Sequence, residues 1–171
     1  MPNKSCCTNL LEALDIVTQA LKEGLSIDIA FLDFAKAFDS VAHERLLLKL
    51  KAYGIREDLI RWFKGFLGGR IQRVVLGKNT SEWKKVTSGV PQGSVTLFSS
   101  GPLFFVIYIN DLMQDLKNSC KLYADDTKVI SVINKIEDNR VMQQDLNKLV
   151  ELSENWLIDF NKDKCKIMHI G

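Results

Sequence analysis

The stretch Leu122-Tyr123-Ala124-Asp125-Asp126-Thr127 places two adjacent aspartates directly after a short apolar run. A second stretch, Phe31-Leu32-Asp33-Phe34, places a third aspartate at the end of another apolar run. Both runs predict buried strands. A carboxylate at the end of a buried strand is costly unless it accepts hydrogen bonds or binds a metal, and three together would repel one another. The pattern therefore predicts a magnesium site at the strand ends of a sheet, a kind of site that carries out phosphate chemistry.

A structural role is the alternative for these acids. A single aspartate is common in a turn, because its side chain accepts hydrogen bonds from nearby backbone amides. Asp33 taken by itself fits the end of a strand as well as it fits a metal site. The adjacent Asp125 and Asp126 are different, because like charges side by side are a poor choice for stability alone.

The composition is that of an ordinary globular protein. The chain has 171 residues, of which 46% are hydrophobic and 26% are charged, so we expect residues 1–171 to form one domain. The four cysteines form no CxxC pair and have no histidine at zinc spacing, which favours reduced thiols. We expect no secretory leader, because residues 1–5 lead into a predicted helix and not into an apolar stretch. The longest apolar stretch, residues 103–109, is far below the roughly 20 residues that span a bilayer.

Basic residues concentrate between Arg61 and Lys85. Seven cations face the single acid Glu82 there, so this segment carries a net charge of +6 while the whole chain carries +2. Aromatic residues are interleaved with the cations, a composition that fits a surface following a phosphate backbone. A solvated hairpin with core aromatics is the alternative. The predicted nucleic-acid contacts are Arg70, Arg73, Lys84 and Lys85.

Periodicity predicts a mixed α/β (α+β) fold. Helices are expected over residues 5–23, 43–53, 56–66, 102–116 and 137–160, and strands over 27–34, 70–76, 82–87, 120–124, 128–133 and 165–170. The order predicts an antiparallel or mixed sheet with helices packed on one side and the Asp125-Asp126 pair in a turn. The expected core residues are Ile29, Phe31, Leu46, Leu50, Phe104, Ile107, Leu122, Leu146, Leu149 and Trp156.

Four segments in order resemble the motifs of reverse transcriptases from non-LTR (LINE-like, jockey-type) retrotransposons. Phe31 to Asp39 resembles the first motif, Ser88 to Ser94 the second, and Tyr123 to Asp126 the paired-aspartate third motif. Trp156 to Gly171 resembles the fourth region. The resemblance implies a polymerase palm, an antiparallel sheet packed against helices with fingers and thumb largely absent. It also implies an RNA template, a DNA primer and deoxynucleoside triphosphates as partners, and a nuclear site of action.

The resemblance assigns the catalytic and metal-binding roles to Asp33, Asp125 and Asp126, which would hold two magnesium ions at the primer 3′-hydroxyl. It implies that Phe38 excludes ribonucleotides by its bulk, although an aromatic at this position also fits a core residue. Gln92 and Gly93 match the loop that approaches the incoming nucleotide. Phe34 and Tyr123, which flank the acids, are assigned to the nucleotide site, and Lys164 matches a lysine that assists departure of pyrophosphate, a solvent-facing lysine being the alternative.

The chain departs from the family pattern in two ways. Residues Thr96 to Ser100 separate the second motif from Gly101-Pro102 by about four residues more than the family spacing. This insertion is either a tolerated loop or a defect that displaces Gln92. The chain also covers little beyond the palm motifs, so we expect weak binding of primer–template and poor polymerisation.

Two other functions fit the sequence. The chain could be a nucleic-acid-binding remnant of a mobile element that has lost its activity, or a two-metal nuclease or phosphatase. The nuclease reading requires histidine or glutamate ligands beside the aspartates, and the sequence around Asp33 and Asp125 has none. His43 and His169, the only histidines, receive no catalytic role.

Overall fold

The computed structural model of the chain describes residues 6–91, 100–123 and 126–171. It divides into two compact units, one of Met1–Ala35 with Asp111–Gly171 and one of Lys36–Asn110. We call the first the sheet unit and the second the hairpin unit. No helix among the described residues is long and apolar enough to cross a membrane.

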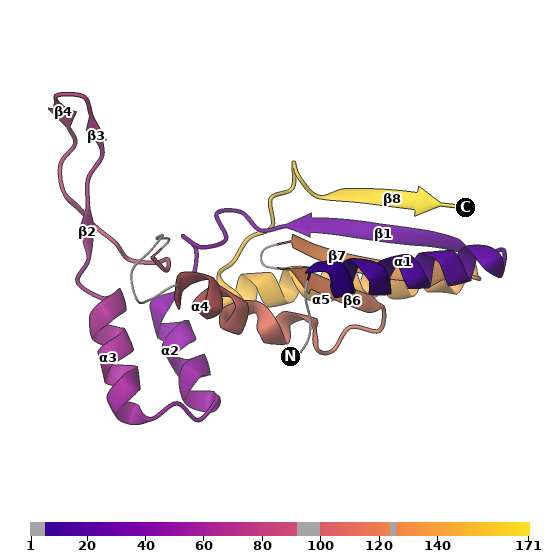
Figure 1. Cartoon of the computed structure of the whole chain (residues 1–171), viewed down its shortest axis with the longest axis horizontal. Helices are drawn as coiled ribbons and strands as arrows, with labels where there is room; N and C mark the ends of the chain where they lie inside the picture. Colours follow the sequence, from indigo (N-terminus) through magenta and orange to yellow (C-terminus); the bar gives the residue numbers. More distant parts are fainter. Residues whose placement is uncertain (1–5, 92–99, 124–125) are drawn as a thin grey trace. The chain divides into compact units, whose positions relative to one another are not determined.

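The sheet unit is built on a four-stranded antiparallel sheet with the strand order β6-β7-β1-β8. The central strand β1 pairs with β7 on one side and with β8 on the other (Figure 1). An antiparallel sheet packed against helices was predicted, and the structure confirms it. The bounds are β1 Ser26–Asp33, β6 Ser119–Tyr123, β7 Asp126–Ile133 and β8 Lys166–Ile170, with the helices α1 Cys6–Lys22 and α5 Ile136–Trp156.

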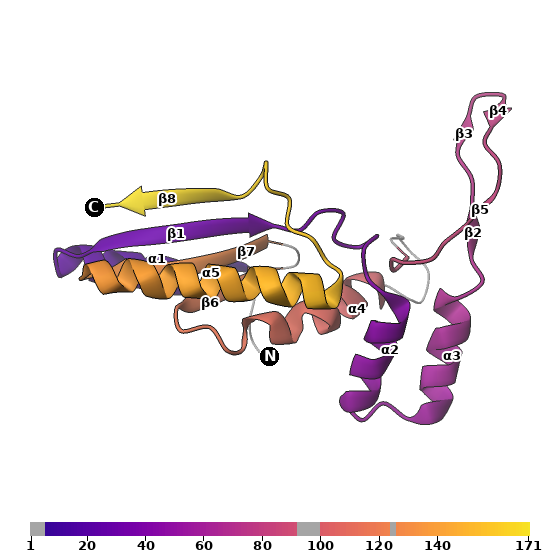
Figure 2. The same cartoon turned by 180° about the vertical axis from the view of Figure 1, so that it is seen from behind.

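Helices cover both faces of this sheet, so the prediction of helices on one side only is wrong. In Figure 1 α1 lies in front of the strands, and the reverse view in Figure 2 has α5 in front. Side chains alternate along β1: Ile27 and Ile29 pack with Ala20 of α1, whereas Ala30 packs with Leu149 of α5. A strand covered on both faces is apolar at odd and even positions alike, which explains the apolar run Ile29-Ala30-Phe31-Leu32 within β1.

Strand β7 begins earlier than predicted. Its first residue is Asp126, which pairs with Asp33 on β1 and with Tyr123 on β6. Asp126 is therefore part of the sheet and does not lie in a turn. The preceding residue, Asp125, is outside the described residues.

The described residues of the hairpin unit, 36–91 and 100–110, form three helices and an extended hairpin. The hairpin follows α3 and contains two short paired segments, β2 with β5 and β3 with β4 (Figure 1). Continuous strands over residues 70–76 and 82–87 were predicted, but every residue of these pairs is exposed. A hairpin without a buried face has little to hold a long ladder in register. The bounds are α2 His43–Ala52, α3 Glu57–Leu67, α4 Ser100–Ile109, β2 Ile71–Gln72, β3 Val75–Leu76, β4 Asn79–Thr80 and β5 Lys84–Lys85.

Two predicted helices end early. The predicted helix over residues 102–116 is α-helical only to Ile109, and a 3₁₀ turn, Asn110–Met113, follows. Helix α5 ends at Trp156 because Leu157 adopts a left-handed conformation with φ 54°. Of the predicted core, five residues are buried, namely Ile29, Leu46, Leu50, Phe104 and Leu149. The other five are half-buried, namely Phe31, Ile107, Leu122, Leu146 and Trp156.

A buried carboxylate fixes the loop before β6. Asp145 on α5 is 3% exposed and accepts hydrogen bonds from the backbone amides of Lys117 and Asn118 at 3.1 and 2.8 Å. Asn118 Nδ2 donates a third at 2.7 Å. These donors compensate the desolvation of the carboxylate, so the loop and the helix stabilise each other.

The thiol of Cys120 on β6 provides a pH-dependent prediction. Burial, with a smaller contribution from the Asp145 carboxylate, raises the pKa of Cys120 to about 12. The thiolate is the reactive species, so at pH 8 this thiol should react about 10³-fold more slowly than one of ordinary pKa. We expect iodoacetamide to alkylate exposed Cys7 in the native protein, whereas Cys120 is modified only after denaturation.

The same pKa shift predicts a loss of stability in alkali. Above about pH 8.5 the Cys120 thiol of the unfolded chain ionises while that of the folded chain keeps its proton. The folded state then binds more protons, so the free energy of unfolding falls as pH rises from about 9 towards 12.

Peptide mapping by mass spectrometry measures the alkylation of each cysteine by iodoacetamide. Equal labelling of Cys7 and Cys120 in the native protein would contradict the predicted protection of Cys120.

Candidate metal and nucleotide site

Two of the three predicted acids meet at one end of the sheet. Asp33 is the last residue of β1 and Asp126 is the first residue of β7, and the two are direct cross-strand partners. Directly opposed residues in an antiparallel pair project to the same face with Cβ atoms about 4.5–5.5 Å apart. Like charges at this spacing destabilise a sheet, so a cation is needed to make the arrangement favourable.

Asp33 is the more buried of the two acids. Its side chain is 21% exposed, and its Oδ2 atom is buried without a hydrogen-bond partner. Lys164 Nζ lies 3.2 Å from this oxygen, which is an ion-pair distance without the angles of a hydrogen bond. A buried carboxylate oxygen that lacks a hydrogen bond is ready to bind a hard cation.

These residues line a shallow hollow. It measures about 410 Å³ and belongs entirely to the sheet unit. The side chains therefore fit a divalent metal, since the carboxylates of Asp33 and Asp126 both line this hollow and one oxygen of Asp33 lacks a hydrogen bond. The lining residues are Phe31, Leu32, Asp33, Asp126, Thr127, Lys128 and Lys164.

Some predicted site residues cannot be placed. Asp125, Gln92 and Gly93 lie outside the described residues, as do Thr96 to Ser99 of the insertion. Tyr123 ends β6 opposite Asp126, and only its backbone is described. Among residues 6–91, 100–123 and 126–171, no three histidine, cysteine, aspartate or glutamate side chains form a metal-binding group.

Within the hairpin unit, the second motif is joined to the last residues of the first motif and to the segment that follows them. Gly89 N donates to Val41 O and Val90 N donates to Phe38 O, each at 2.8 Å. Ser88 Oγ donates to Asp39 O, also at 2.8 Å. These hydrogen bonds join residues that are 48 to 52 positions apart in the sequence.

Gly89 is required at this contact for two reasons. Its φ of 88° lies in the left-handed region, and a Cβ atom at this position would lie 2.8 Å from Asp39 Cα. Its carbonyl is also held, because His43 Nε2 lies 2.8 Å from Gly89 O and Arg70 donates to the same oxygen at 2.6 Å. The second motif therefore has a fixed path up to Pro91.

Comparison with known proteins agrees with these motifs. Residues 1–170 match the family described as reverse transcriptase (RNA-dependent DNA polymerase). The chain belongs to the reverse transcriptase family. This match confirms the reverse transcriptase resemblance, and the mobile-element relatives described next confirm that it is to non-LTR retrotransposon enzymes.

Curated relatives come from mobile elements. The chain is 32% identical over 145 residues to the RNA-directed DNA polymerase from mobile element jockey of Drosophila melanogaster, covering 80% of this chain and 15% of the relative. It is 29% identical over 165 residues to the jockey polymerase of Drosophila funebris, covering 91% and 18%. The chain thus spans less than a fifth of the length of these relatives.

A solved structure supports the fold. Telomerase from Candida tropicalis, determined in complex with a fragment of telomeric RNA, superposes with a TM-score of 0.70. The sequence identity is 15%, and the match covers 97% of this chain and 30% of the telomerase chain. The fold is therefore that of a polymerase palm, as predicted. Members of the reverse transcriptase family generally use divalent metal ions.

Phe34 and Phe38, two of the three aromatic residues predicted at the nucleotide site, differ in accessibility. Phe34 is 3% exposed and stacks on Phe160 with ring centroids 4.8 Å apart. This buried ring packs in the core of the sheet unit and offers no surface to a nucleotide, which corrects its assignment. Phe38 is half-buried, and its ring lies 5.0 Å from that of Phe105. The Phe38 ring is thus partly accessible to solvent and packs against the Phe105 ring.

The predicted nucleic-acid contacts divide into two groups. Arg73, Lys84 and Lys85 are exposed, and the Arg73 guanidinium lies 4.6 Å from the centre of the Trp83 ring. Arg70 is half-buried and donates to Leu67 O at 3.0 Å as well as to Gly89 O. Burial lowers the pKa of Arg70, although an arginine remains charged at neutral pH. Through these two hydrogen bonds, Arg70 links the end of α3 to the backbone of the second motif at Gly89.

A polar hollow lies beside Arg70 and the second motif. It measures about 660 Å³ and is lined by Lys36, Asp39, Arg70, Lys85 and residues 88–91 of the second motif, among others. Its cations suit a phosphate-bearing ligand. It lies wholly in the hairpin unit.

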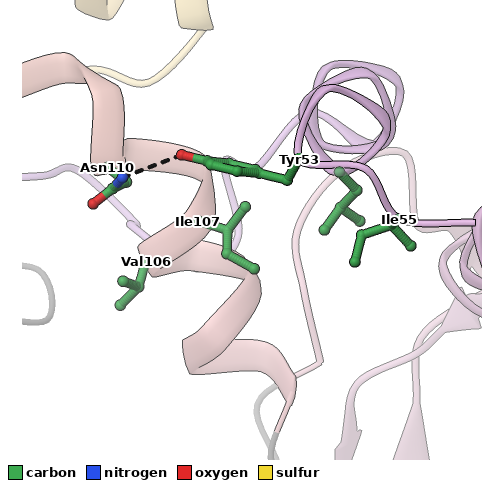
Figure 3. Close-up of a pocket in the computed structure, with 6 residues that line it drawn as sticks. Tyr53, Ile55, Val106, Ile107 and Asn110 are labelled. Carbon is green, nitrogen blue, oxygen red and sulfur yellow. Dashed lines mark hydrogen bonds between the residues drawn. The ribbon is translucent and has the colours of Figure 1, made fainter. Parts of the chain in front are cut away.

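A third hollow is apolar. It measures about 290 Å³, lies between the end of α2 and one face of α4, and is crossed by a hydrogen bond of 3.1 Å from Asn110 Nδ2 to the Tyr53 hydroxyl (Figure 3). Leu50, Ile55, Val106 and Ile107 complete its lining. It has no charged side chain, so it is unsuited to phosphate transfer.

Sequence reasoning missed the role of His43. This residue opens α2, and its contact with Gly89 O spans 46 positions of sequence. Periodicity and capping patterns report only local structure, so no signal in the sequence connects the two residues.

Proposed function

We propose that this chain is the catalytic palm of the RNA-directed DNA polymerase of a non-LTR retrotransposon. In this role it joins the primer 3′-oxygen to the α-phosphorus of a deoxynucleoside triphosphate and releases pyrophosphate, copying an RNA template. The observation that carries the proposal is the pairing of Asp33 with Asp126 beside an orphaned carboxylate oxygen. In this proposal the two compact units act as one palm domain. By analogy with the family, the protein acts in the nucleus.

Asp33, Asp125 and Asp126 would hold two magnesium ions. When bound, the metals polarise the attacking and leaving oxygens and neutralise the triphosphate. The carboxylates fix the positions of these charges, because β1 and β7 are rigid elements and their register aligns Asp33 with Asp126. Lys164 adds a cation at the same end of the sheet.

Other residues select and hold the substrates. Phe38 limits space at the sugar 2′-position, and Gln92, Gly93 and Tyr123 contact the incoming nucleotide. The exposed cations Arg73, Lys84 and Lys85 neutralise backbone phosphates, and Trp83 offers an aromatic face for a base. Arg70 supports this surface indirectly by positioning the second motif.

A second candidate is a nucleic-acid-binding remnant without activity. The insertion from Thr96 to Ser100 favours it, because added residues beside the nucleotide loop can misplace Gln92, and about 1 Å of error can cost about 10²-fold in rate. A nuclease is disfavoured, since His43 contacts Gly89 and His169 contacts Asp28, and neither is among the residues that line the hollow of Asp33 and Asp126.

Primer extension distinguishes these functions. The 171-residue chain is incubated with an RNA template, a labelled DNA primer, magnesium and deoxynucleotides, beside an Asp125→Asn variant. We expect weak extension by a few nucleotides that disappears in the variant, while primer–template binding changes less than about two-fold. Binding without extension in both proteins would indicate the remnant, and extension that survives Asp125→Asn would overturn the proposed mechanism.

A further inference from the structure

Lys164 is held next to Asp33 by the backbone. Its amide and that of Cys165 both donate to Asn161 O at 3.0 Å, and Asn161 N donates to the carbonyl of Asp33 at 2.8 Å. Hydrogen bonds therefore link the turn before β8, which carries Lys164, to the backbone of Asp33. The β1–β8 register agrees, because it pairs Phe31 with Lys166, and two further residues on each strand would set Asp33 opposite Lys164.

Asp33 thus has an acid on one flank and a cation on the other. Asp126 is its partner on β7, and Lys164 Nζ is 3.2 Å from its Oδ2 atom. The lysine side chain is 66% exposed whereas that of Asp33 is 21% exposed. The ammonium can therefore leave for solvent at little cost, while the carboxylate cannot.

Lys128 is the other cation of this hollow, and it is engaged elsewhere. Its Nζ lies 5.6 Å from the centre of the Phe31 ring. Among the described residues, Lys164 is consequently the cation in ion-pair contact with Asp33.

We propose that Lys164 is a positioning residue that occupies the metal-binding oxygen of Asp33 until a divalent metal displaces it. In the metal-free chain the ammonium offsets the repulsion between Asp33 and Asp126. Metal binding takes over this role and releases the lysine side chain, which can then reach the triphosphate. This inference rests on the proposed metal site, and it makes the availability of Lys164 depend on metal loading.

Competition between Lys164 and a metal ion for Asp33 should change the metal affinity by a measurable factor. The apparent affinity for metal is reduced by the fraction of molecules in which Asp33 is free. If the ion pair is formed in about 80–90% of molecules, its removal should tighten metal binding about 5- to 10-fold.

The experiment is a titration with Mn²⁺ alone, in which electron paramagnetic resonance measures the free ion. Wild type, Lys164→Gln, Lys166→Gln and Asp33→Asn are compared. Lys166 is the matched control, because it is an exposed lysine of the same charge two residues along and does not line the hollow. We expect about 5- to 10-fold tighter binding for Lys164→Gln, less than about two-fold change for Lys166→Gln, and loss of the site for Asp33→Asn.

A second readout follows the lysine itself. Reaction of Lys164 with trinitrobenzenesulfonate, mapped by mass spectrometry, should accelerate when Mn²⁺ is added, and the rate at Lys166 should stay constant. Binding that requires Asp33 but is unchanged or weaker in Lys164→Gln would overturn this inference and leave the proposed function intact. Absence of any Asp33-dependent binding in all variants would overturn both.

Discussion

Replacement of Gly89 by alanine should lower the free energy of unfolding by about 3 kcal/mol or more. The new methyl group would lie 2.8 Å from Asp39 Cα and 2.9 Å from Asp39 O, both of them backbone atoms that cannot move aside. The left-handed φ of 88° adds strain for any residue with a Cβ atom. Urea unfolding followed by circular dichroism measures the effect.

Two glycines of the same unit serve as controls. Gly77 has a φ of 60° and no atom within 4 Å of an added Cβ, so Gly77→Ala should cost only about 1 kcal/mol. Gly65 lies inside α3, also in open space, and Gly65→Ala should be neutral or stabilise by up to about 1 kcal/mol. A Gly89→Ala variant no less stable than Gly77→Ala would show that the contact between the two motifs is not tightly packed.

Asp145→Ala should lower the free energy of unfolding by about 3 kcal/mol, because it leaves two backbone amides and the Asn118 side chain without their acceptor. The loss is large because the carboxylate is 3% exposed, so water cannot simply replace it. Asp145→Asn keeps one acceptor oxygen and should be intermediate in stability. Chemical denaturation of the three proteins at neutral pH provides the values.

The neighbouring residue is the matched control for this prediction. Gln144 is exposed, and its side chain accepts a hydrogen bond of 3.4 Å from Lys117 Nζ, so Gln144→Ala should change stability by less than about 0.5 kcal/mol. If Asp145→Ala were equally mild, the loop before β6 would not depend on this carboxylate.

The sheet and its acids were predictable because their signals are local. Apolar runs ending in Asp33 and before Asp125 predict buried strands, and ordered motifs predict a polymerase palm. The register that sets Asp33 opposite Asp126 was not predictable, because strand pairing joins residues 93 positions apart. The start of β7 at Asp126 follows from that pairing.

Predictions failed where tertiary packing overrides local pattern. Phe34 was assigned to the nucleotide by its place next to Asp33, yet its ring stacks on Phe160, a partner that no nearby residue indicates. The apolar run of β1 is compatible with helices on one face or on both, and the structure has both. Long strands were expected in the basic hairpin because β-propensity does not report the absence of a buried face.

The central claim is that Asp33 and Asp126, together with Asp125, bind divalent metal for nucleotidyl transfer. The most direct measurement is an anomalous difference map from a crystal of the chain soaked in Mn²⁺. We predict anomalous peaks at the end of β1, within about 2.5 Å of an Asp33 carboxylate oxygen and in contact with the acids of the third motif. Manganese bound elsewhere, with the Asp33 carboxylate left without metal, would contradict the account.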